Sequence, residues 1–167
     1  MRYDFSINVI LYWICYLIWR FLMRVEHTIL INRPVQAVFG YVADFKTGPE
    51  WMGWMSEAHQ TSEGPMEVGA TAHNKGKVMG RKLETDTEVI EYVPQHSLVL
   101  KSLTGMPSTF HYTFEPVAEG TKLTIVTEAH IAGLFKVAEP LVGNAFHRQS
   151  VHDMETLKDL LEAEVTT

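Results

Sequence analysis

The chain has 167 residues, of which 46% are hydrophobic and 20% are charged, and its formal net charge is −6. This length suits one domain with its own core, and the composition is that of a globular rather than a disordered protein. The negative charge argues against a nucleic-acid partner, because binding to phosphates needs a basic surface. Cys15 is the only cysteine, which excludes an internal disulfide and a cysteine-based zinc site and fits a reducing, cytoplasmic setting.

The first 22 residues form an apolar, aromatic-rich segment that differs from the rest of the chain. Residues 5–23 approach the ~20 apolar residues that a transmembrane helix needs, provided that Arg20 reaches the membrane interface. Three interpretations are open: a membrane anchor, an extension outside the natural protein, or an extra helix packed on the domain or on a partner. If the segment is an anchor, Arg20 and Arg24 favour a cytoplasmic domain.

From residue 23 to residue 167 we expect one domain, which opens with a strand. Residues 25–31 alternate between more and less apolar side chains, the period of a strand. Pro34 then suits the first turn of a helix, and apolar residues recur at helical spacing up to about residue 44. Residues 50–55 indicate a second short helix.

After residue 55 the period changes to two, which predicts a series of antiparallel strands at 56–62, 69–79, 82–93, 97–104, 108–117 and 121–131. Glu84, Asp86 and Glu88 share one face of the third of these strands. We expect this face to be solvated and the opposite face to turn inward. The eight histidines lack the spacings of a metal site, and no phosphate-binding or dinucleotide-binding motif is present. We therefore predict neither a metal ion nor a cofactor.

Helical periodicity returns after Gly133 and extends from residue 134 to about residue 164. Apolar side chains form a stripe along this segment, interrupted by the polar Gln149. The stripe comprises Ala138, Leu141, Val142, Ala145, Phe146, Met154, Leu157, Leu160 and Leu161. We expect a long helix that packs this stripe across the concave face of the sheet.

Several short motifs occur in a characteristic order along these elements: Ile31-Asn32-Arg33-Pro34, Trp51-Met52-Gly53-Trp54, Glu91-Tyr92-Val93-Pro94 and Tyr112-Thr113-Phe114-Glu115-Pro116. In motifs and element order, residues 23–164 resemble the START-like, or SRPBCC, superfamily, most closely its polyketide cyclase/dehydrase and lipid-transport branch. The resemblance implies the α+β helix-grip fold, in which a curved antiparallel sheet wraps around a long C-terminal helix and two short helices follow the first strand. It also implies a cavity between sheet and helix that binds hydrophobic molecules.

The leading functional hypothesis is binding or transport of a hydrophobic small molecule, such as a lipid or a polyketide-like compound, in this cavity. Rigid aromatic rings and adaptable methionines suit apolar recognition. The predicted lining residues are Trp51, Trp54, Met55, Met79, Met106, Phe110, Tyr112, Phe114, Leu134, Phe135, Leu141 and Phe146.

Two other classes of function stay open. An enzyme of the polyketide cyclase/dehydratase type would need polar groups inside the cavity, for which Tyr112, His147 and Arg148 are the candidates. A membrane-tethered interaction module would depend on the segment at residues 1–22. Nothing in the sequence specifies an oligomeric state.

Overall fold

The computed structural model describes residues 21–78, 80–131 and 139–163. Seven strands, three α-helices and one short 3-10 helix, η1, are formed by this part of the chain. In chain order they are β1 (Phe21–Ile31), α2 (Val35–Ala43), η1 (Phe45–Thr47), α3 (Gly48–Trp51), β2 (Met55–Gln60), β3 (Thr71–Val78), β4 (Arg81–Val93), β5 (Ser97–Ser102), β6 (Ser108–Val117), β7 (Gly120–Ile131) and α4 (Glu139–Ala163).

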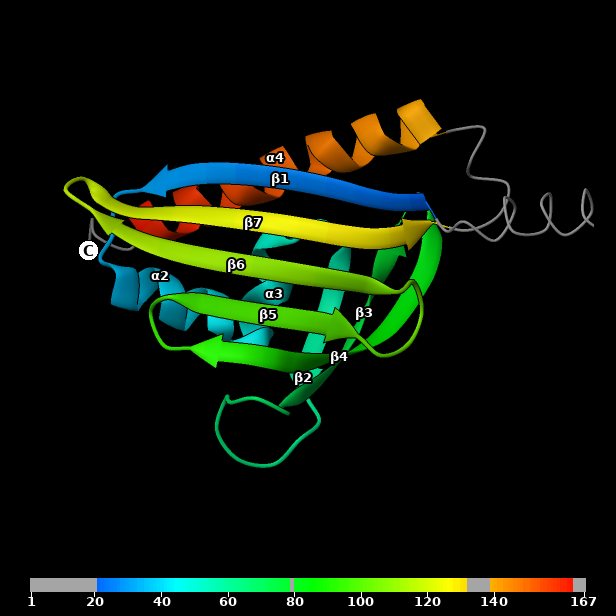
Figure 1. Ribbon diagram of the computed structural model, residues 1–167, viewed down its shortest axis with the longest axis horizontal. Helices are drawn as coiled ribbons and strands as arrows, with labels where there is room; N and C mark the ends of the chain where they lie inside the picture. Colours follow the sequence, from blue (N-terminus) through cyan, green and yellow to red (C-terminus); the bar gives the residue numbers. More distant parts are fainter. Residues whose placement is uncertain (1–20, 79, 132–138, 164–167) are drawn as a thin grey trace, which may run out of the picture.

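The seven strands form one antiparallel sheet in the order β1-β7-β6-β5-β4-β3-β2. The first strand thus pairs with the last, and β2 and β3 curl away from the plane of the other strands (Figure 1). All three helices lie on the same side of the sheet, with α4 running behind β1 (Figure 1). This arrangement confirms the predicted α+β helix-grip architecture, with short helices after the first strand and a long C-terminal helix.

The first strand begins at Phe21, two residues before the domain boundary expected at residue 23. Its first residues pair with the end of β7, Phe21 opposite Ile131, and this pairing extends the strand toward the N-terminus. Within the described ranges, no helix is long and apolar enough to cross a membrane. Residues 1–20, on which the anchor hypothesis depends, lie outside these ranges, so its three interpretations stay predictions.

The second short helix was expected at residues 50–55, and this position is wrong. Helical turns occupy η1 and α3 instead, and β2 already begins at Met55. The side chain of Asp44 accepts a hydrogen bond from the Lys46 backbone amide at 3.0 Å and so caps the first of these turns. Pro49 lies in the first turn of α3, a position where proline is favoured rather than disruptive.

The hydrophobic core lies between the sheet and the helices. Its fully buried side chains come from both layers and include Ile31, Val38, Val89, Leu98, Phe114, Leu123, Leu157 and Leu161. Phe39 of α2 meets Phe114 of β6 edge to face, with ring centroids 5.0 Å apart. This aromatic contact fastens the first helix to the middle of the sheet.

Candidate functional site

A cavity of about 420 Å³ lies between the inner face of the sheet and helices α3 and α4. Its volume is in the range of pockets that hold small organic ligands. The sheet contributes Val25, Asn74, Thr85, Thr87, Leu100, Phe110, Tyr112 and Ile125, among others. The helical side contributes Phe45, Trp51, Met52, Trp54, Ala145, Phe146, Gln149, Asp153 and Met154, and Met55, the first residue of β2, also lines the cavity. Most of the wall is apolar, with a few polar groups on each side.

The sequence of α4 explains why space stays open over one part of the sheet. In the first half of the helix, the small or polar side chains of Ala145, Gln149 and Ser150 line the cavity. Further along, Leu157 and Leu161 are fully buried in the core. Leu157 and Leu161 fill the volume under the C-terminal half, whereas Ala145, Gln149 and Ser150 leave space beside Phe146 under the first half. The cavity and the filled core therefore lie against successive segments of α4.

The backbone at Trp54, which borders the cavity, lies unusually close to the backbone of β3. The Lys77 amide donates a hydrogen bond to the Trp54 carbonyl oxygen at 2.7 Å. A Cβ atom on Gly76 would lie 1.9 Å from that same oxygen, so only glycine permits the approach. Gly76 thereby places the tryptophan where its ring lines the cavity.

One buried carboxylate, that of Asp153 on α4, lines the cavity and was not among the predicted site residues. Its exposed fraction is 8%, and its Oδ1 atom accepts hydrogen bonds from the Gly53 amide at 2.9 Å and from Gln149 Nε2 at 2.7 Å. Burial raises the pKa of this carboxyl group, and the two hydrogen bonds oppose the rise. The available signal was that Gln149 and Asp153 interrupt the apolar stripe with polar residues one turn apart.

Tyr112 of β6 reaches the cavity from the sheet, and its residue is 3% exposed. Burial raises the pKa of its phenol well above the usual range, and the nearby charge of Asp153 raises it further. The phenol therefore stays protonated at neutral pH and can donate a hydrogen bond. A carboxylate and a phenol thus converge on one cavity from opposite layers.

A histidine pair joins β1 to α4 beside the cavity. The ring of His27 lines the cavity, and its centroid lies 4.4 Å from that of His147. Burial lowers the pKa of His27, and the neighbouring His147 lowers it further. His147 and Arg148 are themselves exposed and do not line the cavity. Of the three candidate catalytic residues, Tyr112 alone does so.

A family model described as polyketide cyclase/dehydrase and lipid transport matches residues 23–162. The chain belongs to this family. The match spans the short helices, all of the strands except the first two residues of β1, and all but the last residue of α4, so it includes part or all of every element that forms the cavity.

Solved structures of several differently named proteins show the same fold. The Zhui aromatase/cyclase from Streptomyces sp. R1128 has a TM-score of 0.73 at 16% identity, covering 88% of this chain and 98% of that one. The di-domain ARO/CYC StfQ from the steffimycin biosynthetic pathway gives 0.72 at 16% identity, covering 87% of this chain and 52% of that one. Ara h 8.0201 gives 0.65 at 11%, covering 86% and 99%. The comparison with curated proteins finds no match.

The structure brings most of the predicted lining residues of this family member to one cavity. Those that line it are Trp51, Trp54, Met55, Met106, Phe110, Tyr112 and Phe146. Phe114 instead lies in the core at 0% exposure, because Phe39 of α2 covers it. Met79, Leu134 and Phe135 lie outside the described residues, as does the side chain of Leu141.

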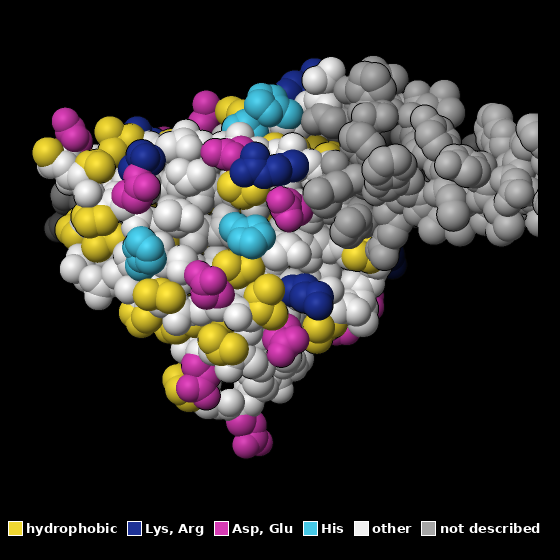
Figure 2. Space-filling model, viewed as in Figure 1, with side chains coloured by type: hydrophobic (Ala, Val, Ile, Leu, Met, Phe, Trp, Pro, Cys, Tyr) yellow, Lys and Arg dark blue, Asp and Glu magenta, His cyan; other side chains and the backbone are white. Residues whose placement is uncertain are grey.

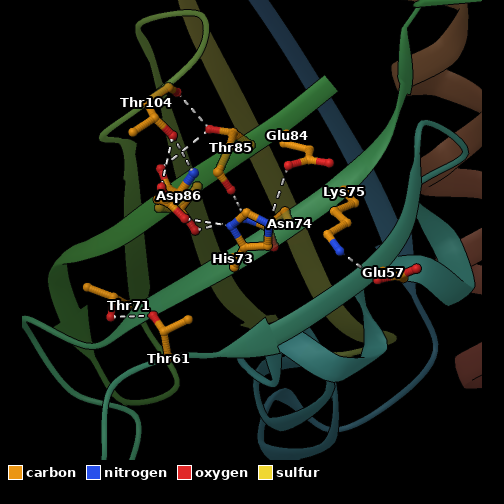
Figure 3. Close-up of polar contacts among 11 residues, drawn as sticks. Glu57, Thr61, Thr71, His73, Asn74, Lys75, Glu84, Thr85, Asp86 and Thr104 are labelled. Atoms are coloured by element: carbon orange, nitrogen blue, oxygen red, sulfur yellow. Dashed lines mark hydrogen bonds and ion pairs between the residues drawn. The ribbon is translucent and has the colours of Figure 1, made fainter. Parts of the chain in front are cut away.

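The outer face of the sheet carries the carboxylates that were expected to be solvated. Glu84 and Asp86 are absent from the cavity wall, whereas Thr85 and Thr87, which alternate with them on β4, line it. Asp86 pairs with Nδ1 of His73 at 2.7 Å (Figure 3), and this hydrogen bond lowers its pKa. Charged, histidine and apolar side chains are interspersed on this face (Figure 2). Within the described ranges, no cluster of side chains is suited to hold a metal ion.

Proposed function

We propose that this protein binds a hydrophobic small molecule in the cavity between the sheet and α4 and carries it without altering it chemically. The observation that carries the proposal is the cavity of about 420 Å³, walled mostly by aromatic, methionine and aliphatic side chains. Protein interiors are normally close-packed, so an apolar space of this size beside a filled core favours a role for an occupant.

The size of the cavity limits what such an occupant can gain. Burying about 300 Å² of ligand surface at ~25 cal/mol per Å² contributes roughly 7.5 kcal/mol of gross driving force. Association costs at least several kcal/mol, while micromolar affinity needs about 8 kcal/mol net. Apolar burial alone therefore falls short. The proposal favours a ligand that fills the cavity and also meets its polar groups.

The test is a pair of alanine-to-phenylalanine substitutions on α4. Ala145 lines the cavity, so Ala145→Phe should fill part of it and weaken binding of the neutral dye Nile red at least tenfold. Ala163, exposed at the end of the same helix, provides the matched control, and Ala163→Phe should bind the dye like the parent chain. Equal binding by both variants, or none by the parent chain, would contradict the proposal. Native mass spectrometry of the full chain should reveal a co-purified small molecule.

A second candidate is a cyclase or dehydratase acting on a polyketide-like substrate. What favours it is the convergence of Tyr112 and Asp153, a proton donor and a carboxylate, on one cavity. Two proteins whose solved structures have this fold are an aromatase/cyclase and a di-domain ARO/CYC. Incubation with aromatic polyketide precursors, followed by mass spectrometry, should then show a product that is lost in Tyr112→Phe and in Asp153→Asn. Binding without turnover supports the carrier function.

A further inference from the structure

The charges around the cavity are distributed unevenly. Among the lining residues that the structure describes, the ionisable side chains are those of His27, Asp44, Lys77, Tyr112 and Asp153. Lys77 is the only lysine or arginine among them, and it is exposed. Asp153 is buried, and His27 is biased toward its neutral form. The inner wall thus offers one buried carboxyl group and no buried lysine or arginine in the described residues.

The carboxylate of Asp153 is held in one orientation by both of its neighbours. The Gly53 amide and Gln149 Nε2 both donate to its Oδ1 atom, so one oxygen is fully engaged by protein. A Cβ atom on Gly53 would lie 2.5 Å from Gln149 Nε2, so glycine at this position allows Gln149 and the Gly53 amide to reach Asp153 together. No group in the described ranges donates to Oδ2, and none forms a hydrogen bond with the Tyr112 hydroxyl.

We propose that the cavity selects an uncharged ligand bearing an alcohol or phenol hydroxyl, which donates to Asp153 Oδ2 and accepts from Tyr112, and that it rejects carboxylate ligands such as fatty acids. The inference rests on the proposed binding function and deepens it. A hydroxyl group can form both of these hydrogen bonds, because it is a donor and an acceptor at once. A methyl group supplies neither, and an ammonium group supplies no acceptor for the phenol.

Carboxylate ligands are disfavoured because a second negative charge beside a buried carboxylate disfavours ionisation of both. Such a ligand can enter only with uptake of a proton. Its affinity should therefore fall as the pH rises through the pKa of Asp153, whereas an alcohol binds the ionised form and keeps its affinity. The other charges that bear on Asp153 do not reverse this sign: His152 on α4 favours the ionised form, and Tyr112 stays neutral.

Three pyrene derivatives that differ in one substituent test the proposal: 1-pyrenemethanol, pyrene-1-carboxylate and 1-methylpyrene. Trp51 and Trp54 line the cavity, so energy transfer from tryptophan to pyrene reports binding to the full chain. At pH 8 the alcohol should bind at least tenfold more tightly than the carboxylate and several-fold more tightly than the methyl compound. Calorimetry in two buffers of different ionisation enthalpy should detect proton uptake with the carboxylate only.

Substitution of the carboxyl group separates its role from that of the cavity wall. Asp153→Asn should reduce the preference for alcohol over carboxylate at least tenfold. Asp159 lies on the same helix but is exposed and outside the cavity, so Asp159→Asn should keep the full preference.

The possible outcomes separate the ligand selectivity from the carrier function. A carboxylate that binds the parent chain as tightly as the alcohol at pH 8, or binds without proton uptake, overturns the selectivity while the carrier function stands. Failure of all three pyrenes and of Nile red to bind overturns the carrier function itself. The calorimetric test uses the unmodified chain, so it decides the question even if Asp153→Asn does not fold.

Discussion

Leu157 fastens the C-terminal half of α4 to the core, and shortening its side chain measures what that contact contributes. The residue is 0% exposed, so Leu157→Ala removes three carbon atoms from a fully packed site. At ~0.8 kcal/mol per buried carbon, the lost transfer free energy is about 2.4 kcal/mol. The unfilled cavity adds a further ~1–2 kcal/mol if the neighbours do not collapse into it. We expect a loss of about 3–4 kcal/mol in the free energy of unfolding.

The assay is urea denaturation followed by tryptophan fluorescence, with the midpoint and slope compared between variants. For a chain of this size, the same change corresponds to a fall in melting temperature of roughly 6–16 °C. Leu103→Ala is the matched control, because Leu103 is 51% exposed and its loss should cost about 0.5 kcal/mol or less. If Leu157→Ala costs no more than this control, the packing of α4 on the sheet is not as described.

Three further predictions follow from the site and the first strand. Gly76→Ala places a methyl group against the Trp54 carbonyl and should cost about 1–3 kcal/mol in urea denaturation and weaken Nile red binding; unchanged binding would show that the backbone at Trp54 adjusts. Burial lowers the pKa of His27 from its ordinary 6.5, so the unfolded chain binds the proton more tightly, and stability should fall as the pH drops below 6.5. The fall should be smaller in His27→Gln, and equal slopes in pH-dependent melting would refute the assignment. A chain of residues 23–167 should fold without residues 1–22, with a cooperative melt; an insoluble product would place the removed segment in the core.

The alternation of side chains was enough to predict the sheet, because each strand has one face on the core and one in solvent. The alternation could not show which residues of the inner face line the cavity and which are buried in the core. Phe110, Tyr112 and Phe114 share that face on β6, yet the first two line the cavity and Phe114 is sealed in the core. The division depends on which helix side chain stands opposite each strand residue, and Phe39 of α2 stands opposite Phe114. Such pairings arise from tertiary packing and leave no periodic signal.

The position of Asp153 was missed for a related reason. In the helical pattern Gln149 was interpreted as an interruption of an apolar stripe, and Asp153, one turn later, was not singled out. Their meaning depends on the backbone amide of Gly53, a hundred residues earlier, which meets the carboxylate only after the chain has folded. Polar residues on an otherwise apolar helical face are the signal that sequence alone offers for such a site.

One segment of α4 lines the cavity and the next packs in the core, and these two segments contribute differently to stability. Leu157 and Leu161 contribute burial where the helix meets the filled core, whereas Asp153 carries a desolvation cost beside the cavity. A buried carboxylate weakens the fold unless its hydrogen bonds offset the cost, and here one oxygen is left to be satisfied from the cavity. The burial of Leu157 and Leu161 near the C-terminus of α4 offsets this desolvation cost. A ligand hydroxyl that completes the hydrogen bonding of Asp153 would therefore stabilise the segment of α4 that borders the cavity.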